Sequence, residues 1–205
     1  MAPEPSVAGF ILAGGKSSRM GSDKAFLEFR GETLLQRAMA VLRSAAGTVT
    51  VVGDPTRFPR EVAAVADTYP GCGPLGGIHA ALAHSACELN LVMAVDLPLV
   101  TAELLVFLRE AARSSGAMAV VPRTARGFQP LCAVYRRHFG TLAEKALRAG
   151  RYKVDAVFAE EAVRIVGEEE LAAGGFSERL FFNVNTPDDL RAAESGESGQ
   201  PASFS

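Results

Sequence analysis

A glycine-rich segment near the start of the chain has the residue types that bind phosphate. Positions 12–24 read Leu-Ala-Gly-Gly-Lys-Ser-Ser-Arg-Met-Gly-Ser-Asp-Lys and follow an apolar run. Successive backbone N–H groups in such a loop form a concavity that binds anions. Arg19 and Lys24 could neutralise a phosphate held there. The pattern favours a phosphate site, while an ordinary glycine-rich turn accounts for the glycines alone.

The two common glycine-loop patterns do not match this segment. The P-loop pattern G-x-x-x-x-G-K-[ST] requires glycine at position 10, which is Phe10 in this chain. The dinucleotide-binding pattern G-x-G-x-x-G is also absent from the segment. The sequence therefore argues against a P-loop ATPase and against a typical dinucleotide-binding enzyme.

Two aspartates follow predicted strands. Asp67 comes after the weak apolar run 62–65, and Asp96 ends the apolar run 89–95. In open α/β sheets ligands bind beyond the carboxyl ends of the strands, where these side chains would lie. Mg²⁺ is commonly held by one or two carboxylates together with substrate phosphates. Asp96 is thus a candidate Mg²⁺ ligand, but an aspartate before Leu-Pro is a common turn residue, and for Asp96 taken alone the turn is the favoured interpretation.

Three further segments offer polar or backbone contacts to a ligand. Gly73, Pro74, Leu75 and Gly76 open a predicted helix, whose N-terminal N–H groups favour an anionic ligand. The segment 181–190 contains two asparagines on one face of an extended stretch, ahead of a Thr-Pro helix cap. A polar stretch at 151–153 contains two basic residues that could hold a phosphate. Helix initiation, helix capping and a solvated loop explain most of these features without a ligand.

The elements that must position these residues alternate between strand and helix patterns, which is typical of an α/β sheet. The helix patterns show apolar residues at i, i+3/i+4 and i+7, and Thr101 is the expected N-cap of one helix. Strands are predicted at 7–13, 49–52, 62–65, 89–95, 117–121, 131–135 and 163–166, helices at 34–42, 77–86, 101–108, 139–149 and after Pro187, and a polar loop at 123–129.

Composition restricts the class of protein. The 205 residues are 48% hydrophobic and 21% charged, as in a globular protein. We predict one domain at 1–193 and, from the Ser, Gly, Glu and Pro content, a disordered tail at 194–205. The net charge of −2 disfavours a nucleic acid partner. No signal-peptide pattern or membrane-length apolar run is present, and the three cysteines form no C-x-x-C pair, so we expect a cytoplasmic protein.

Taken in order, these segments resemble the molybdenum cofactor guanylyltransferases, the MobA family. The resemblance lies in LAGGKSSRMGSDK at 12–24, Asp67 followed by GPLGG at 73–77, VDLP at 95–98, QPLCAVY at 129–135 and FFNVNTPDDL at 181–190. It implies a Rossmann-like nucleotidyltransferase fold, with a mostly parallel central sheet and helices on both faces. It also implies transfer of GMP from GTP to the phosphate of molybdopterin, with release of pyrophosphate and with Mg²⁺ as cofactor.

The resemblance assigns roles to residues. Arg19, Lys24 and Asp96 would be catalytic, and Asp96 would be the metal ligand. The nucleotide would be bound by Leu12, Ala13, Gly14, Gly15, Lys24, Gly53, Asp67, Gly73, Pro74, Leu75, Gly76 and Asp96. Asn183, Asn185 and Lys153 would lie on the pterin side. The implied partners are GTP, a molybdopterin substrate and, transiently, proteins of the molybdenum cofactor pathway or acceptor enzymes.

Two departures and several alternatives stay open. The family often has Cys where this chain has Val95, and a polar residue, often Asn, where it has Gly53, so that Asp54 could substitute in a ribose or base contact. A molybdopterin cytidylyltransferase or a sugar-phosphate nucleotidyltransferase would share the fold, although those relatives more often read Leu-Ala-Ala-Gly. A non-catalytic nucleotide-binding module is the alternative of another class, and the presence of Lys24 and Asp96 argues against it. No physical argument from the sequence distinguishes guanine from cytosine.

Overall fold

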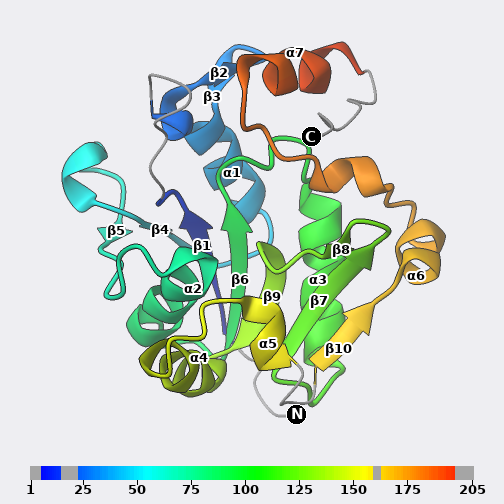
Figure 1. Ribbon diagram of the computed structural model, residues 1–205. Helices are drawn as coiled ribbons and strands as arrows, with labels where there is room; N and C mark the ends of the chain where they lie inside the picture. Colours follow the sequence, from blue (N-terminus) through cyan, green and yellow to red (C-terminus); the bar gives the residue numbers. More distant parts are fainter. Residues whose placement is uncertain (1–5, 15–22, 159–162, 197–205) are drawn as a thin grey trace, which may run out of the picture.

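A central β-sheet organises the chain (Figure 1). The computed structural model describes residues 6–14, 23–158 and 163–196. The strands of the main sheet are β1 (Val7–Leu12), β4 (Thr48–Val52), β5 (Ala64–Val65), β6 (Leu89–Ala94), β7 (Ala119–Thr124), β8 (Gly127–Phe128), β9 (Cys132–Arg136) and β10 (Val163–Val166). Their order is β10-β7-β9-β6-β1-β4-β5, and β8 pairs with β7. A separate hairpin is formed by β2 (Glu28–Phe29) and β3 (Glu32–Thr33).

Most strand pairs of the main sheet path are parallel. β1 lies between β6 and β4 and is parallel to both, β4 is parallel to β5, and β7 is parallel to β10. β9 is inserted between β6 and β7 and runs antiparallel to both. The carboxyl ends of β1, β4, β5 and β6 therefore meet at one edge of the sheet. This is the edge at which ligands bind in open α/β folds.

Helices cover both faces of the sheet, as predicted. They are α1 (Leu34–Arg43), α2 (Gly73–His84), α3 (Ala102–Arg113), α4 (Phe139–Arg148), α5 (Val154–Phe158), α6 (Glu168–Ala173) and α7 (Pro187–Ser195), with 3₁₀ turns η1 (Lys24–Phe26), η2 (Pro55–Arg57) and η3 (Glu178–Phe181). No helix in these described ranges is long and apolar enough to span a bilayer.

Two apolar clusters, one on each face, form the core. Because side chains alternate along a strand, neighbouring residues of β1 enter different clusters. Ile11 packs in the cluster that contains Leu42 of α1 and Leu105 of α3. Phe10 packs in the cluster that contains Ile78 of α2 and residues of α4 and α5. The sheet is thus buried on both faces, which explains why its strands read as nearly continuous apolar runs.

The structure corrects several element boundaries. The predicted polar loop at 123–129 includes the end of β7 and all of β8, which pair as a hairpin. Gly127, the first residue of β8, follows the turn of that hairpin and has a φ of 103°. A two-residue strand is too short to produce a recognisable period, which is why the sequence did not predict it. The short helices α5 and α6 were missed for the same reason.

The helix α2 begins at Gly73, four residues before the predicted start at 77, with Pro74 in its first turn. The predicted tail at 194–205 also begins too early, because α7 continues to Ser195. The side chain of Arg30 donates to the carbonyl oxygens of Ala193 and Glu194. These hydrogen bonds satisfy two carbonyl groups in the last turn of α7. Positions 197–205 lie outside the described residues.

Candidate functional site

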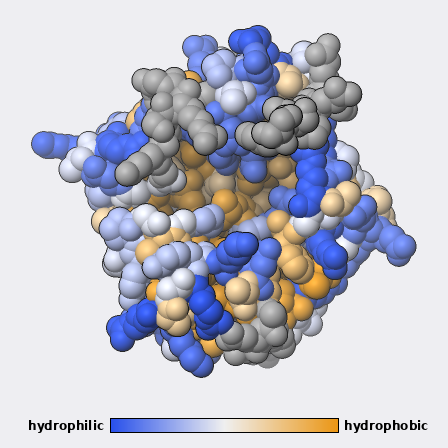
Figure 2. Space-filling view, in the orientation of Figure 1, coloured by the Kyte–Doolittle hydropathy of each residue, from blue (hydrophilic) through white to orange (hydrophobic). Residues whose placement is uncertain are grey.

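A cleft of about 680 Å³ opens at the carboxyl edge of β1, β4, β5 and β6. Figure 2 shows an apolar hollow near the middle of this face, bordered by hydrophilic side chains. The cleft is lined by the predicted nucleotide-binding residues Leu12, Ala13, Gly14, Lys24, Gly53, Asp67, Gly73, Pro74 and Asp96. Residues from five separate segments of the sequence are thus brought together as expected. Gly15 and Arg19 lie outside the described residues.

The start of the cleft is fixed by backbone hydrogen bonds at the end of β1. The Leu12 carbonyl oxygen accepts from the Val95 amide at 3.1 Å, and the Ala13 amide donates to the Val52 carbonyl oxygen at 3.0 Å. These bonds hold the chain between β4 and β6 up to Gly14, which is exposed in the cleft. A ligand can therefore approach the backbone of Gly14 without meeting a side chain.

Asp67 is held against the first turn of α2. Its Oδ1 atom accepts from the Tyr69 amide at 2.8 Å. A Cβ atom added to Gly76 would lie 3.1 Å from Asp67 Oδ2 and 2.8 Å from the Tyr69 carbonyl oxygen, so glycine is required at this position. Leu75 is fully buried in the core. Neither Leu75 nor Gly76 is among the residues that line the cleft. Both shape the site by packing, unlike Gly73 and Pro74.

Lys24, Asp96 and Asn185 form a hydrogen-bonded group at the cleft. Lys24 Nζ donates to Asn185 Oδ1 at 2.7 Å and to Asp96 Oδ2 at 3.4 Å. The Val184 amide donates to the Asp96 carbonyl oxygen at 2.9 Å, which brings the C-terminal segment across the end of β6. Asp189 Oδ2 accepts from the Asn185 amide at 2.9 Å and thereby holds that residue in place.

The electrostatics of Asp96 suit a cation. Its side chain is 21% exposed. Burial raises the pKa of the Asp96 carboxyl, and the nearby ammonium group of Lys24 opposes that shift without cancelling it. A partly buried carboxylate gains from a nearby positive charge, so a cation beside Asp96 would be stabilised.

The carboxylate of Asp96 fits the predicted Mg²⁺ site. The described ranges contain no group of three or more His, Cys, Asp or Glu side chains that could hold a metal ion by themselves. A metal ion at Asp96 would therefore take most of its ligands from substrate phosphates and water. That ligand set is typical of Mg²⁺ in phosphoryl-transfer sites.

The departure at Gly53 has a structural reason. A Cβ atom at this position would lie 3.3 Å from Cε2 of Phe58, so the Phe58 ring fills the space beside it. Asp54 caps η2, because its Oδ1 atom accepts from the amide of Thr56 at 2.9 Å and from the hydroxyl of the same residue at 2.7 Å. These bonds lower the pKa of the Asp54 carboxyl. Asp54 lines the cleft with one oxygen already used in the turn.

The residues predicted for the pterin side are placed differently from one another. Asn185 contacts Lys24 and so lies beside the nucleotide-side residues. Asn183 is exposed and does not line the cleft. Lys153 is exposed immediately before α5 and does not line the cleft either. The structure therefore brings only one of these three residues to the Lys24 group.

Sequence reasoning missed several residues of the cleft, among them Arg57 and Leu131. Arg57 donates from Nε to Asp23 Oδ2 at 2.9 Å, and both side chains line the cleft. Nothing in the sequence marks an arginine after a strand as a site residue. Leu131 also lines the cleft, because its carbonyl oxygen accepts from the Ala94 amide at 2.8 Å. Leu131 belongs to the QPLCAVY segment of the family resemblance, so the sequence did offer a reason to include it in the site.

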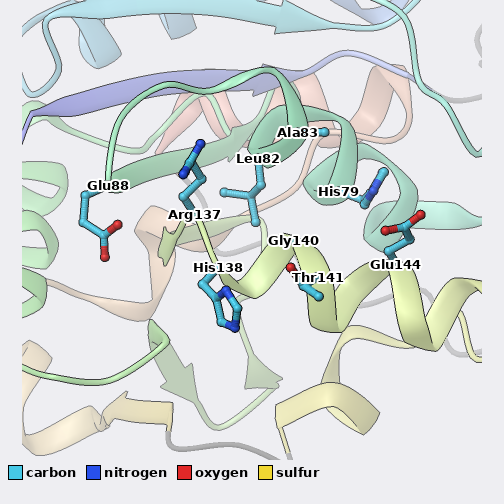
Figure 3. Close-up of a pocket in the computed structure, with 9 residues that line it drawn as sticks. All are labelled: His79, Leu82, Ala83, Glu88, Arg137, His138, Gly140, Thr141 and Glu144. Atoms are coloured by element: carbon cyan, nitrogen blue, oxygen red, sulfur yellow. The ribbon is translucent and has the colours of Figure 1, made fainter.

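A second pocket of about 340 Å³ lies between α2 and α4 (Figure 3). Glu88 and Arg137 are at one end of the view, and His79 and Glu144 are at the other. The Nδ1 atom of His79 lies 3.1 Å from the Thr68 hydroxyl, in a structural contact. These side chains do not converge on a common point. The cleft at the strand ends is therefore the better candidate for the active site.

Comparisons with known proteins agree with this geometry. Residues 9–165 match the model of the MobA-like NTP transferase domain. The chain is 40% identical over 184 residues to a probable molybdenum cofactor guanylyltransferase of Pelotomaculum thermopropionicum, covering 89% of each chain. It is 33% identical over 199 residues to the molybdenum cofactor guanylyltransferase of Desulfosudis oleivorans, covering 92% of this chain and 95% of that one.

Solved structures show the same fold. The molybdopterin-guanine dinucleotide biosynthesis protein A of Archaeoglobus fulgidus superposes with a TM-score of 0.79 at 28% identity, covering 92% of this chain and 97% of that one. The 2-C-methyl-D-erythritol 4-phosphate cytidylyltransferase of Thermus thermophilus superposes with a TM-score of 0.67 at 22% identity, covering 91% and 96%. The predicted nucleotidyltransferase fold is thereby confirmed.

Proposed function

Since the chain belongs to the MobA-like NTP transferase family, we propose that it is a molybdenum cofactor guanylyltransferase. It transfers GMP from GTP to the phosphate of molybdopterin and releases pyrophosphate. The observation that carries this proposal is the ion pair of Lys24 and Asp96 at the carboxyl edge of the sheet. The cleft at this edge is also lined by the end of β1 and the start of α2. The names of relatives that are 40% and 41% identical to this chain support guanine as the base.

The reaction needs no side-chain nucleophile. An oxygen of the acceptor phosphate attacks the α-phosphorus of GTP and forms a new P–O bond. The bond from the α-phosphorus to the bridging oxygen breaks, and pyrophosphate leaves with that electron pair. Both reactants are anions, so the chain must align them and neutralise charge as it moves onto the leaving group.

Three groups of the chain perform these tasks. Lys24 directs its ammonium group at the phosphates, in the region where Asp96 Oδ2 now accepts its hydrogen bond at 3.4 Å. The backbone at Gly14 and the first turn of α2 supply N–H groups and leave room for phosphate oxygens. Asp96 would hold Mg²⁺, which supplies charge neutralisation at the phosphates when bound. Asn185 orients Lys24 through its 2.7 Å hydrogen bond.

The setting of the enzyme follows from the same proposal. Its substrates are GTP and molybdopterin, and its product passes to an acceptor enzyme in a transient contact. We place the reaction in the cytoplasm, in keeping with Cys72, Cys87 and Cys132, which are free thiols.

Pyrophosphate release with molybdopterin and Mg²⁺ tests the proposal when GTP, CTP and ATP are compared at equal concentration. A strong preference for GTP is expected. A preference for CTP would identify the sister cytidylyltransferase activity, for which the Thermus thermophilus fold neighbour is the precedent. Nucleotide binding without turnover would support a non-catalytic module instead.

A further inference from the structure

Two loops that are far apart in the sequence join at the mouth of the cleft. Arg57 in η2 donates from Nε to Asp23 Oδ2 at 2.9 Å and forms an ion pair with the same oxygen through its second guanidinium nitrogen. The rings of Phe26 in η1 and Phe58 after η2 also connect these two segments, with centroids 6.2 Å apart. The connection after β4 is thus fastened to the segment that contains Lys24.

Asp23 passes this constraint to the backbone of Lys24. While Oδ2 accepts from Arg57, Oδ1 accepts from the Ala25 amide at 3.1 Å as the N-cap of η1. The Leu27 amide donates to the Lys24 carbonyl oxygen at 3.1 Å and closes the turn. Lys24 is the first residue of η1, so its backbone is fixed by the hydrogen bonds of this turn. The capping residue of the turn, Asp23, is itself held by Arg57.

The ion pair of Arg57 and Asp23 can affect nucleotide binding, because it restricts the backbone of Lys24. The side chain of Arg57 is 32% exposed and that of Asp23 is 22% exposed, so water screens the pair only in part. A lysine side chain has four rotatable bonds and loses much entropy when it is held at one position. Fixing its backbone in advance reduces the entropy lost on ligand binding.

We propose that Arg57 is a positioning residue of the nucleotide site, which holds Asp23 and through it directs Lys24 toward the phosphates. The inference rests on the proposed function for the role of Lys24, and it assigns Arg57 no contact with the nucleotide. It predicts that the contribution of Arg57 to nucleotide affinity depends on the presence of Lys24.

A double-mutant cycle on Arg57 and Lys24 tests this dependence. Calorimetry first measures the Kd of the wild-type protein for GTP, CTP and ATP with Mg²⁺, and the cycle uses the nucleotide that binds most tightly. The variants are Arg57→Met, Lys24→Met and their combination. Asp23→Asn is the milder second variant, because an asparagine keeps the cap on Ala25 while weakening the ion pair. Arg60→Met, at an exposed arginine of the same loop, controls for lost charge. Thermal unfolding reports whether each variant is folded.

The expected result is a Kd about five-fold weaker for Arg57→Met, a similar change for Asp23→Asn and no change for Arg60→Met. In the Lys24→Met background, Arg57→Met should have no further effect. An equal loss in both backgrounds would overturn the inference, because Arg57 would then act on the nucleotide directly, and the proposed function would stand. Wild-type affinity in both Arg57→Met and Asp23→Asn would also overturn it. A wild-type protein that binds none of the three nucleotides would overturn the proposed function and this inference together.

Discussion

The ammonium group of Lys24 donates to two acceptors, Asn185 Oδ1 and Asp96 Oδ2, and its third N–H donor is available to a phosphate oxygen in the cleft. Before substrate binds, Lys24 partly neutralises the partly buried carboxylate of Asp96. A Mg²⁺ ion held by Asp96 would supply that neutralisation instead and would leave Lys24 to the phosphates. Lys24 and Asp96 would thus stabilise each other in the absence of substrate and bind phosphates and metal in its presence.

Replacing Lys24 by methionine removes the ammonium group and its charge while keeping an unbranched side chain. We expect kcat/KM to fall about 100-fold or more, as for other groups that stabilise charge in the transition state. The melting temperature should change little, because partly exposed ion pairs contribute little to stability. Lys145→Met, at an exposed position of α4, is the matched control and should keep wild-type kinetics. Turnover within a few-fold of wild type would remove Lys24 from the mechanism.

Asp96→Asn should separate function from stability. The pKa of Asp96 is raised in the folded protein, so its charged form costs free energy of folding at neutral pH. The stabilisation from its protonated form is complete below the unfolded pKa of 3.8 and is lost as pH rises through the higher folded pKa. The neutral variant should therefore have a higher free energy of unfolding than the wild type at pH 7 and an equal one below pH 3.8, while turnover is abolished.

Denaturant unfolding at a series of pH values measures this difference. A variant that is less stable than the wild type at pH 7 would show that the attraction of Lys24 outweighs the burial of Asp96.

The sequence predicts a site residue only where that residue belongs to a local pattern. Lys24, Asp67 and Asp96 follow strands or a glycine loop, and each of these features can be recognised in the sequence alone. The contact of Lys24 with Asn185 joins residues 161 positions apart, and that of Asp23 with Arg57 joins residues 34 apart. Local spacing carries no information about such contacts, so the first was assigned to another part of the site and the second was missed.

At the scale of elements, the first turn of α2 determines how Asp67 is presented. The amide of Tyr69 holds Asp67, and the missing side chain of Gly76 lets α2 approach both. Sequence patterns predicted this helix and its glycine opening, as well as the N-cap Thr101, whose hydroxyl accepts from the Leu104 amide. They did not predict β8, α5 or α6, because elements this short do not complete a recognisable period.

Gly76→Ala tests the close approach of α2. The added methyl group would lie 2.8 Å from the Tyr69 carbonyl oxygen, so the helix and the Asp67 segment must separate. We expect the free energy of unfolding to fall by about 1–3 kcal/mol and the KM for the nucleotide to rise. Gly116→Ala, where an added Cβ meets nothing within 4 Å, is the control and should change neither quantity. Equal stability and KM in the two variants would show that the contact is not needed.

At the scale of the whole molecule, the parallel half of the sheet explains the location of the site. Alternating strand and helix patterns predicted an α/β fold, and the resemblance to the MobA family implied helices on both faces. The structure confirms both. The order of the strands was not predicted. The alternation of side chains along a strand shows which residues face the core, but it does not show which strands pair with one another. In particular, β9 is inserted antiparallel between β6 and β7, and it ends the run of parallel strands next to β6.

The proposed reaction transfers the guanylyl group of GTP, with its α-phosphorus, to a phosphorylated pterin. The most direct test uses GTP labelled with ³²P at either the α or the γ position, with molybdopterin, Mg²⁺ and the full-length protein. Lys24→Met serves as the inactive control. The account predicts that α-label enters the pterin product and that γ-label is released as pyrophosphate. Transfer of γ-label to the pterin would indicate a kinase, and release of γ-label as orthophosphate would indicate a GTPase. Either result would contradict the account.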